Sequence, residues 1–197
     1  MPHEFHENMV IWKDREGSWN GIGFFGQSRH GKTPLSLALA YTLFTNGMRE
    51  MKLFDECFKI EDGRIRQCRD WGTRDQLGET YYTKLAESMK QSGQSINELK
   101  AGDHSYLLSN VAAYLLIADS PVPFRKRRCS REEFVEALIP TNPFTWDEPK
   151  PGKDALFQRL KSNWIYYIIN RQKKTTNELI ELITKETLED TRPWRSN

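Results

Sequence analysis

The sequence has few cysteines and no long apolar segment. It contains three cysteines in 197 residues, Cys57, Cys68 and Cys129, and no two of them form a C-x-x-C pair. An odd number of scattered cysteines argues against a disulfide framework or a zinc ribbon, and it favours a reducing compartment such as the cytoplasm. The sequence also lacks a run of 18 apolar residues and an N-terminal signal, so we expect neither a membrane span nor secretion.

An excess of charge of one sign is also lacking. The 29 basic and 27 acidic residues leave a net charge of +2, which excludes nucleic-acid binding through overall charge alone. An apolar fraction of 38% is sufficient for a folded core, and the length suits one domain. We therefore expect a single domain over residues 1–197, with flexible termini at residues 1–18 and 191–197.

The most informative stretch present is a glycine-containing turn between two apolar segments. The residues Gly26-Gln27-Ser28-Arg29-His30-Gly31-Lys32-Thr33 fit the pattern G-x-x-x-x-G-K-[ST] at every fixed position. The apolar residues at 22–25 predict a buried strand, and those at 35–43 predict a helix packed on a sheet. This strand–turn–helix context is the one that a phosphate-binding loop needs.

The residue types of this loop predict its chemistry. Gly26 and Gly31 permit backbone conformations and close approaches that a Cβ would block. The loop N–H groups can then surround phosphate oxygens, and the N-terminus of the following helix adds partial positive charge. Lys32 can reach the β and γ phosphates, and the Thr33 hydroxyl is a ligand for Mg²⁺. The eight residues therefore predict a site for ATP and Mg²⁺, although no base-recognition motif distinguishes ATP from GTP.

A second Mg²⁺ ligand has two candidates. Asp55 and Glu56 end a short predicted strand that begins at residue 51, and Asp119 ends a longer apolar segment. An Asp at the carboxyl end of a central strand would lie beside the loop, where ligands bind in open α/β sheets. We favour Asp119 with Thr33 for Mg²⁺ and Glu56 as the carboxylate that orients the attacking water; Asp55 is the alternative.

The segment before Asp119 also permits two structures. Residues 113–119 are typical of a buried parallel strand, which Pro121 and Pro123 would end sharply. A buried helix over residues 104–118 is the alternative, because the period of the apolar residues is ambiguous.

The remaining elements are predicted from periodicity, capping and breaker residues. They are an edge strand at residues 9–12, a helix C-cap at Asn46-Gly47, an irregular surface segment at 59–80, a helix at 81–90, a linker or lid at 140–153, a helix at 154–161, a central strand at 164–169 and a final helix after Thr175.

The densest basic run lies at residues 125–131. Ser130 and Glu133 resemble a capping box that begins the next helix. A basic cluster before a helix could bind a nucleic-acid backbone through its phosphates, although a solvated loop is the alternative.

Residues 26–33 resemble the Walker A motif of P-loop NTPases, and the order of elements is similar to that of the additional-strand class. Within that class the chain resembles the FtsK–HerA superfamily, which includes genome-packaging ATPases of viruses. The resemblance implies an α/β fold with a mostly parallel central sheet and helices on both faces. It also implies Gln172, at the end of the strand 164–169, as a γ-phosphate sensor, and a ring in which Arg159 or Arg171 reaches the neighbouring subunit's nucleotide.

Three functions are compatible with these features. The first is an ATPase, catalytic through Lys32, Glu56 and Gln172, that translocates or packages nucleic acid, expected to be double-stranded DNA, in host cytoplasm or a virion. The second is a small-molecule kinase, whose phosphate-gripping lid would be the arginine-rich residues 64–74. The third is a nucleotide-binding switch with little turnover, which is favoured by Ser120 in the position of the usual Glu.

Overall fold

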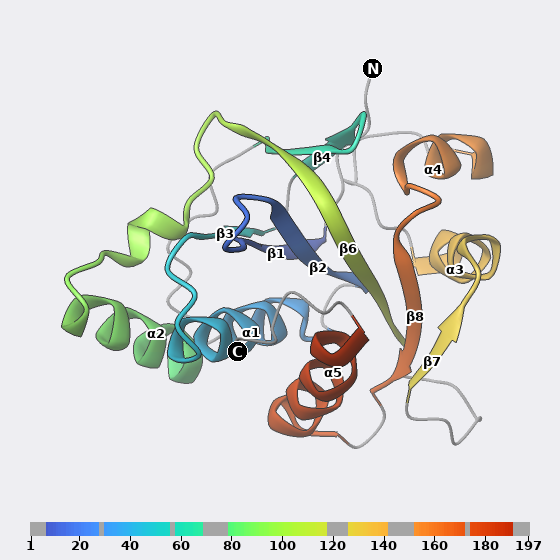
Figure 1. Cartoon of the computed structure of the whole chain (residues 1–197). Coiled ribbons are helices and arrows are strands. Elements are labelled where there is room, and N and C mark those ends of the chain that lie inside the picture. Colours follow the sequence, from blue (N-terminus) through green and yellow to red (C-terminus); the bar gives the residue numbers. More distant parts are fainter. Residues whose placement is uncertain are drawn as a thin grey trace.

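The computed structural model describes residues 7–27, 30–55, 58–68, 79–117, 126–141, 152–171 and 174–190. It is a mixed α/β protein in which an open sheet is flanked by helices (Figure 1). The strands are β1 (Asn8–Lys13), β2 (Trp19–Gly26), β3 (Met51–Phe54), β4 (Phe58–Glu61), β5 (Arg64–Gln67), β6 (Ser105–Ile117), β7 (Lys126–Cys129) and β8 (Ile165–Asn170). The helices are α1 (Lys32–Thr45), α2 (Glu79–Gln91), α3 (Arg131–Leu138), α4 (Lys153–Arg159) and α5 (Thr176–Asp190), with 3-10 turns at Ile96–Leu99 and Ile139–Thr141.

The sheet is mixed rather than mostly parallel. Its main path runs β3-β1-β2-β6-β8-β7, and the β4–β5 hairpin attaches to the first part of β6. Among the described strands, β2–β6 and β6–β8 are the parallel pairs, and β1 is antiparallel to both of its neighbours. The expected mostly parallel sheet is therefore wrong, because a strand from the beginning of the chain is inserted between β2 and β3.

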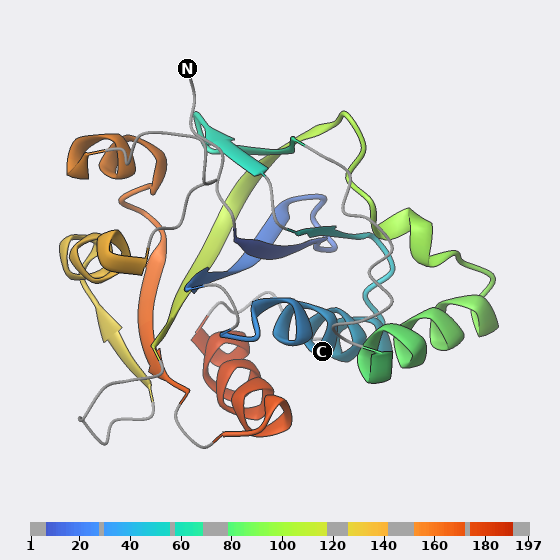
Figure 2. The ribbon, with the colours of Figure 1, turned by 180° about the vertical axis from the view of Figure 1, so that it is seen from behind.

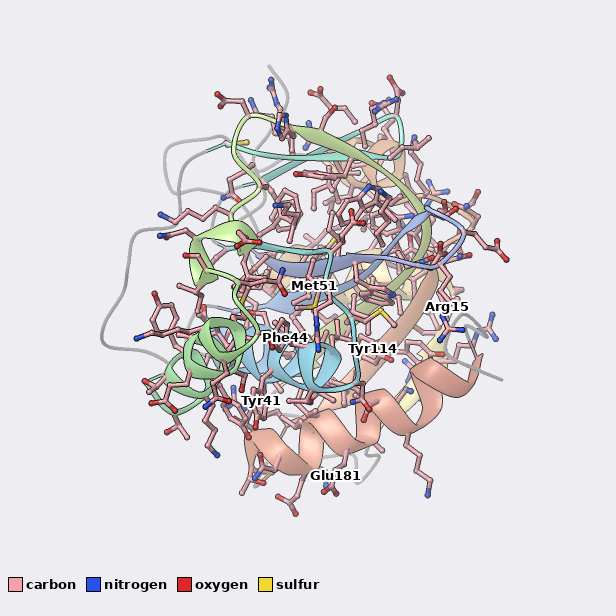
Figure 3. All side chains as sticks on the ribbon, turned by 60° about the vertical axis from the view of Figure 1, so that its left-hand side comes forward. Arg15, Tyr41, Phe44, Met51, Tyr114 and Glu181 are labelled. Carbon is pink, nitrogen blue, oxygen red and sulfur yellow. The ribbon has the colours of Figure 1, made fainter. Side chains whose placement is uncertain are left out.

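Helices cover both faces of the sheet, as the sequence predicted. Apolar side chains of α1, α2 and α5 form one core cluster with one face, and those of α3 and α4 form a second cluster with the other face. Figure 2 shows the same arrangement from behind. In Figure 3, Phe44, Met51 and Tyr114 point into the first core, whereas Arg15 and Glu181 lie on the outside.

The first strand lies inside the sheet. β1 pairs with β2 on one side and β3 on the other, and Met9 to Trp12 are at most 3% exposed. Met9 and Ile11 enter one core and Val10 and Trp12 the other, which explains why four consecutive residues are apolar. The predicted edge strand is therefore an inner strand, and the predicted flexible terminus at residues 1–18 is wrong for the part that the structure describes.

Two further segments differ from the sequence predictions. Part of the segment predicted as irregular, residues 59–80, forms the β4–β5 hairpin, whose turn places Asp62 and Gly63 at φ 49° and 76°. A turn with positive φ at both central positions matches the twist of the two strands. The basic run 125–131 contains a short edge strand, β7, because its backbone groups pair with β8.

Other local predictions are confirmed. β6 is a strand over its whole length, so the alternative helix at residues 104–118 is wrong. Ser130 and Glu133 form a reciprocal capping box at the start of α3, and Gly47 follows α1 with a positive φ of 96°. The linker residues 142–151 and the tail 191–197 lie outside the described residues. Within the described ranges, no helix combines the length and the apolar character needed to cross a membrane.

Candidate phosphate-binding site at the carboxyl edge of the sheet

The candidate site lies where the parallel strands β2, β6 and β8 end. Gly26 closes β2 beside Leu116 of β6, and Ile117 pairs with Asn170 at the end of β8. Because β1 runs in the opposite direction, its first residues lie at the same edge, with Asn8 paired to Phe24. Four strands of the chain therefore meet around the loop that joins β2 to α1.

The two glycines of the loop adopt backbone conformations that other residues avoid. Gly26 has a φ of 138° and Gly31 a φ of 75°. A Cβ on Gly26 would lie 2.7 Å from the carbonyl oxygen of Leu116, so the loop leaves the sheet in contact with β6. Gly31 is the N-cap of α1. Within the described residues no side chain caps this helix end, and the first turn of α1 contains no acidic residue. The first N–H groups of α1 are thus directed at the loop without a carboxylate neighbour from their own helix.

The Lys32 ammonium group is held inside the loop. Its Nζ atom donates hydrogen bonds to the carbonyl oxygens of Gly26 and Gln27, at 2.6 and 3.0 Å, and the side chain is 8% exposed. A buried ammonium group with three donors needs such acceptors. The carbonyl groups of Gly26 and Gln27 therefore hold the Lys32 ammonium group against the loop.

A carboxyl group from the start of β1 lies against the same lysine. Glu7 is fully buried; its Oε2 atom lies 3.3 Å from Lys32 Nζ, and its Oε1 accepts the Gly26 N–H at 3.3 Å. Burial raises the pKa of the Glu7 carboxyl from 4.5 to about 8, although Lys32 and the Gly26 N–H oppose the shift. At neutral pH the Glu7 carboxyl is then mostly protonated and uncharged. It therefore does not neutralise Lys32, whose positive charge can be balanced by an anion from outside the chain.

Thr33 and Asp55 lie together on the other side of the loop. The Thr33 hydroxyl donates to Asp55 Oδ1 at 3.2 Å, and the Asn8 amide contacts both Asp55 Oδ1 and Thr33 Oγ1. Hydroxyl and carboxylate oxygens are ligands that suit Mg²⁺, which usually takes few protein ligands and completes its shell with water and phosphate. The residues thus fit a Mg²⁺ site, although the described part of the chain contains no group of three His, Cys, Asp or Glu residues that could hold a metal.

His30 and Arg171 close the remaining side of the loop. The Nδ1 atom of His30 lies 3.2 Å from the Leu116 carbonyl oxygen, which ties the loop to β6. Arg171 follows β8, and its guanidinium packs against Gly31, where a Cβ would lie 2.5 Å from Cζ. Burial lowers the pKa of the Arg171 guanidinium, so its environment disfavours the charge.

Several predicted site residues lie outside the described residues. These are Ser28 and Arg29 of the loop, Glu56, Asp119 and Gln172. Of the expected ligands, Gly26, Gln27, His30, Gly31, Lys32 and Thr33 are described and lie together. The structure brings Asp55, the alternative Mg²⁺ ligand, into contact with Thr33.

Sequence reasoning missed Glu7 and Asn8, and it considered Arg171 only for a neighbouring subunit. Glu7 and Asn8 precede the apolar run of β1, and no periodicity connects them to a loop about 20 residues later. Only the antiparallel insertion of β1 beside β2 brings them to the site. The close approach of Arg171 to Gly31 likewise depends on the pairing of β6 with β8.

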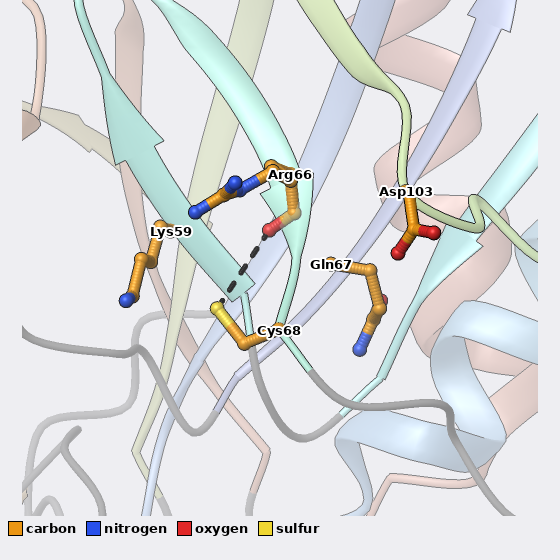
Figure 4. Close-up of a pocket in the computed structure, with 5 residues that line it drawn as sticks. All are labelled: Lys59, Arg66, Gln67, Cys68 and Asp103. Atoms are coloured by element: carbon orange, nitrogen blue, oxygen red, sulfur yellow. Dashed lines mark hydrogen bonds between the residues drawn. The ribbon is translucent and has the colours of Figure 1, made fainter.

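A second concave site lies on the β4–β5 hairpin (Figure 4). It has a volume of about 330 Å³ and is lined by Lys59, Arg66, Gln67, Cys68 and Asp103. The buried Gln67 amide donates to the carbonyl oxygen of Asp55 at 3.0 Å. Asp55 therefore lies beside both sites. Its backbone carbonyl contacts Gln67 of the pocket, and its side chain contacts Thr33 of the loop.

The basic run around β7 is largely occupied by contacts within the chain. The Lys126 ammonium lies 4.1 Å from the ring centroid of Tyr167, and Arg127 pairs with Glu133 at 3.1 Å. The Arg131 guanidinium lies over the Phe157 ring at 4.7 Å. Arg128 is exposed on the same strand. These contacts position β7 and α3. Fewer positive charges are therefore available to a nucleic acid than the number of basic residues in the sequence indicates.

In the comparisons with known proteins, no family model and no curated protein matches the chain.

Proposed function

We propose that the chain binds a nucleoside triphosphate with Mg²⁺ at residues 26–33, ATP being the expected nucleotide, and hydrolyses it to drive work on nucleic acid. One observation carries the proposal. An uncapped helix N-terminus, two glycines with positive φ and the buried Lys32 ammonium group converge on one loop at the carboxyl edge of the sheet. That combination of donors is suited to phosphate.

The residues have separate roles in this proposal. The loop N–H groups and Lys32 hold the phosphates, and Thr33 supplies an oxygen to Mg²⁺. Asp55 is the described candidate for the second oxygen; Asp119 remains a candidate outside the described residues. Bound Mg²⁺ would neutralise phosphate charge during transfer. Glu56 as the water-orienting carboxylate and Gln172 as the γ-phosphate sensor remain part of the proposal on the sequence alone.

The nucleic-acid part of the proposal rests on the resemblance to packaging ATPases. The basic run gives it limited support, because Lys126, Arg127 and Arg131 already contact neighbouring side chains. A homo-oligomeric ring, double-stranded DNA as the partner and a location in host cytoplasm or a virion are proposed on the same basis.

The test is phosphate release from Mg²⁺–ATP with and without double-stranded DNA. Lys32→Ala should abolish both nucleotide binding and release, because it removes the buried cation of the loop. Lys13→Ala is the matched control, since Lys13 is an exposed lysine paired with Glu50. DNA-stimulated release that is lost only in Lys32→Ala supports the proposal. Nucleotide binding without release under either condition contradicts hydrolysis and leaves the switch function.

The pocket of Figure 4 favours a kinase as a second candidate. Lys59 and Arg66 would give an acceptor substrate two cations, and Gln67 connects the pocket to Asp55. With ATP and a panel of nucleoside monophosphates, a kinase forms a phosphorylated product, and Arg66→Ala weakens acceptor saturation without affecting ATP binding. If every acceptor remains unmodified while phosphate is released, the kinase is excluded for that panel.

A further inference from the structure

The guanidinium group of Arg171 lies on the phosphate-binding loop of its own chain. The Arg171 N–H donates to the Ile117 carbonyl oxygen at 2.9 Å, and the Arg171 carbonyl accepts the Lys174 N–H at 3.0 Å. The first bond holds the backbone at the end of β8 against the end of β6, and the second closes a turn after β8. A Cβ on Gly31 would lie 2.5 Å from the Cζ atom and 2.6 Å from the Nη2 atom of Arg171. The side chain therefore packs directly over the N-cap of α1.

This position is costly for a cation in the absence of an anion. The Nη1 atom is buried and, within the described part of the chain, finds no hydrogen-bond acceptor. A buried donor without an acceptor destabilises a protein, and the cost is larger when the group is charged. The positive end of the α1 dipole at Gly31 further disfavours a cation at this position.

The two carboxyl groups that the structure describes at the loop do not relieve this cost. Glu7 contacts Lys32 and the Gly26 N–H, and Asp55 contacts Asn8 and Thr33. Both groups are engaged on the other sides of the loop. Within the described residues no group supplies the acceptor that Arg171 Nη1 lacks, and an anion beside Gly31 would satisfy the guanidinium and the helix N-terminus together.

We propose that Arg171 donates hydrogen bonds to a phosphate group of the nucleotide bound by the loop of the same chain. This inference rests on the proposed function and deepens it. It differs from the expectation from the resemblance, in which an arginine reaches the neighbouring subunit. Arg171 is then a phosphate-binding residue, and its bonds to β6 and its contact with Gly31 hold it beside the site before the nucleotide arrives.

The first experiment compares nucleotide affinity and stability in Arg171→Ala, Arg171→Lys and the control Arg128→Ala. We expect Arg171→Ala to weaken binding of a fluorescent ATP analogue about 10- to 100-fold, as loss of a hydrogen bond to a charged group implies. Arg171→Lys should lose less, because it keeps the charge without the planar fork. Arg128→Ala should bind as the natural chain does.

Stability without nucleotide separates this role from a structural one. If Arg171 serves a bound phosphate, Arg171→Ala keeps or raises the melting temperature of the nucleotide-free protein, because it removes a half-buried cation whose buried Nη1 atom has no acceptor among the described residues. The increase in melting temperature on adding nucleotide then becomes smaller. A lower melting temperature without nucleotide, together with unchanged affinity, overturns the proposal.

Mixing two variants separates action within one chain from action on a neighbour. The Arg171→Ala chain lacks the arginine but keeps an intact loop, and the Lys32→Ala chain lacks the loop lysine but keeps Arg171. If the arginine served a neighbouring subunit, mixed assemblies would recover tight binding sites; if it serves its own chain, the mixture stays weak. Recovery overturns the proposal. Should the natural chain bind no nucleotide at all, the proposed function itself fails, whereas equal binding by natural chain and Arg171→Ala removes only this inference.

Discussion

The buried Glu7 carboxyl makes stability depend on pH in an unusual direction. Its pKa rises from 4.5 to about 8 on folding, so between these values the folded protein keeps a proton that the unfolded chain has released. Raising the pH through this range therefore favours unfolding. We expect Glu7→Gln to remove this dependence, so that the variant gains stability relative to the natural chain as pH rises from about 5 to 8.

Urea unfolding at several pH values measures this difference. Glu50→Gln is the control, because Glu50 is an exposed partner of Lys13 whose removal should shift stability equally at each pH. A constant difference between Glu7→Gln and the natural chain would show that Glu7 does not hold a proton in this range.

A second residue-scale prediction concerns Gly31. An alanine at this position would adopt a φ of 75° and overlap the Arg171 guanidinium, whereas Gly47 has a similar φ of 96° with no atom within 4 Å of a new Cβ. Both substitutions cost about 1–2 kcal/mol for the left-handed backbone. We expect Gly31→Ala to cost more than Gly47→Ala in thermal unfolding, and the added change Arg171→Ala to recover the excess. Equal costs for the two alanines would contradict the contact.

At the scale of elements, β1 should behave as a core strand. Ile11 is fully buried, so Ile11→Ala should lower the free energy of unfolding by about 2–5 kcal/mol. Ile139 is 37% exposed, and Ile139→Ala should cost far less. Chemical denaturation of the two variants measures both values. Similar small costs would mean that the first strand is peripheral, as the sequence alone suggested.

The accuracy of the sequence predictions depended on whether a signal was local. The strand and the helix on either side of residues 26–33, the capping box at Ser130 and the strand β8 were predicted correctly because their patterns lie within a few neighbouring residues. The Asp62-Gly63 pair, flanked by buried Phe58, Ile60 and Ile65, was also a local hairpin signal, and charged neighbours concealed it.

Contacts between distant strands were not predictable in this way. The position of β1 between β2 and β3 follows from the sheet order, which no short pattern specifies. The same order brings Glu7 to Lys32 and Arg171 to Gly31. Sequence reasoning therefore predicted the strand and helix that flank the loop and missed Glu7 and Asn8, which lie beside it.

At the scale of the whole molecule, the two cores share their central strands. β2 and β6 contribute alternate side chains to both clusters: Ile22 and Phe24 pack with α1, while Phe25 packs with α3. Loss of either core would expose the other face of the same strands. We expect amide hydrogen exchange to give similar opening free energies in β2, β6 and β8, close to that of global unfolding.

Hydrogen exchange followed by NMR tests this prediction. The edge strand β7 and the hairpin β4–β5 serve as internal controls, because each pairs with the rest of the sheet along a short edge and should open more easily. The prediction is wrong if α3, α4 and β8 lose protection together while β2 stays protected. That result would show two independent folding units.

The order of the strands along the chain has a consequence for synthesis on the ribosome. β1, β2 and β3 can pair as soon as they emerge, since they lie within the first 54 residues. The parallel partner of β2 begins only at Ser105, and β8 begins at Ile165. Until then the nascent chain presents one side of β2 as an open edge of apolar residues, which is a template for pairing with other chains. Chaperone binding during translation should therefore be strongest between the emergence of β3 and that of β6.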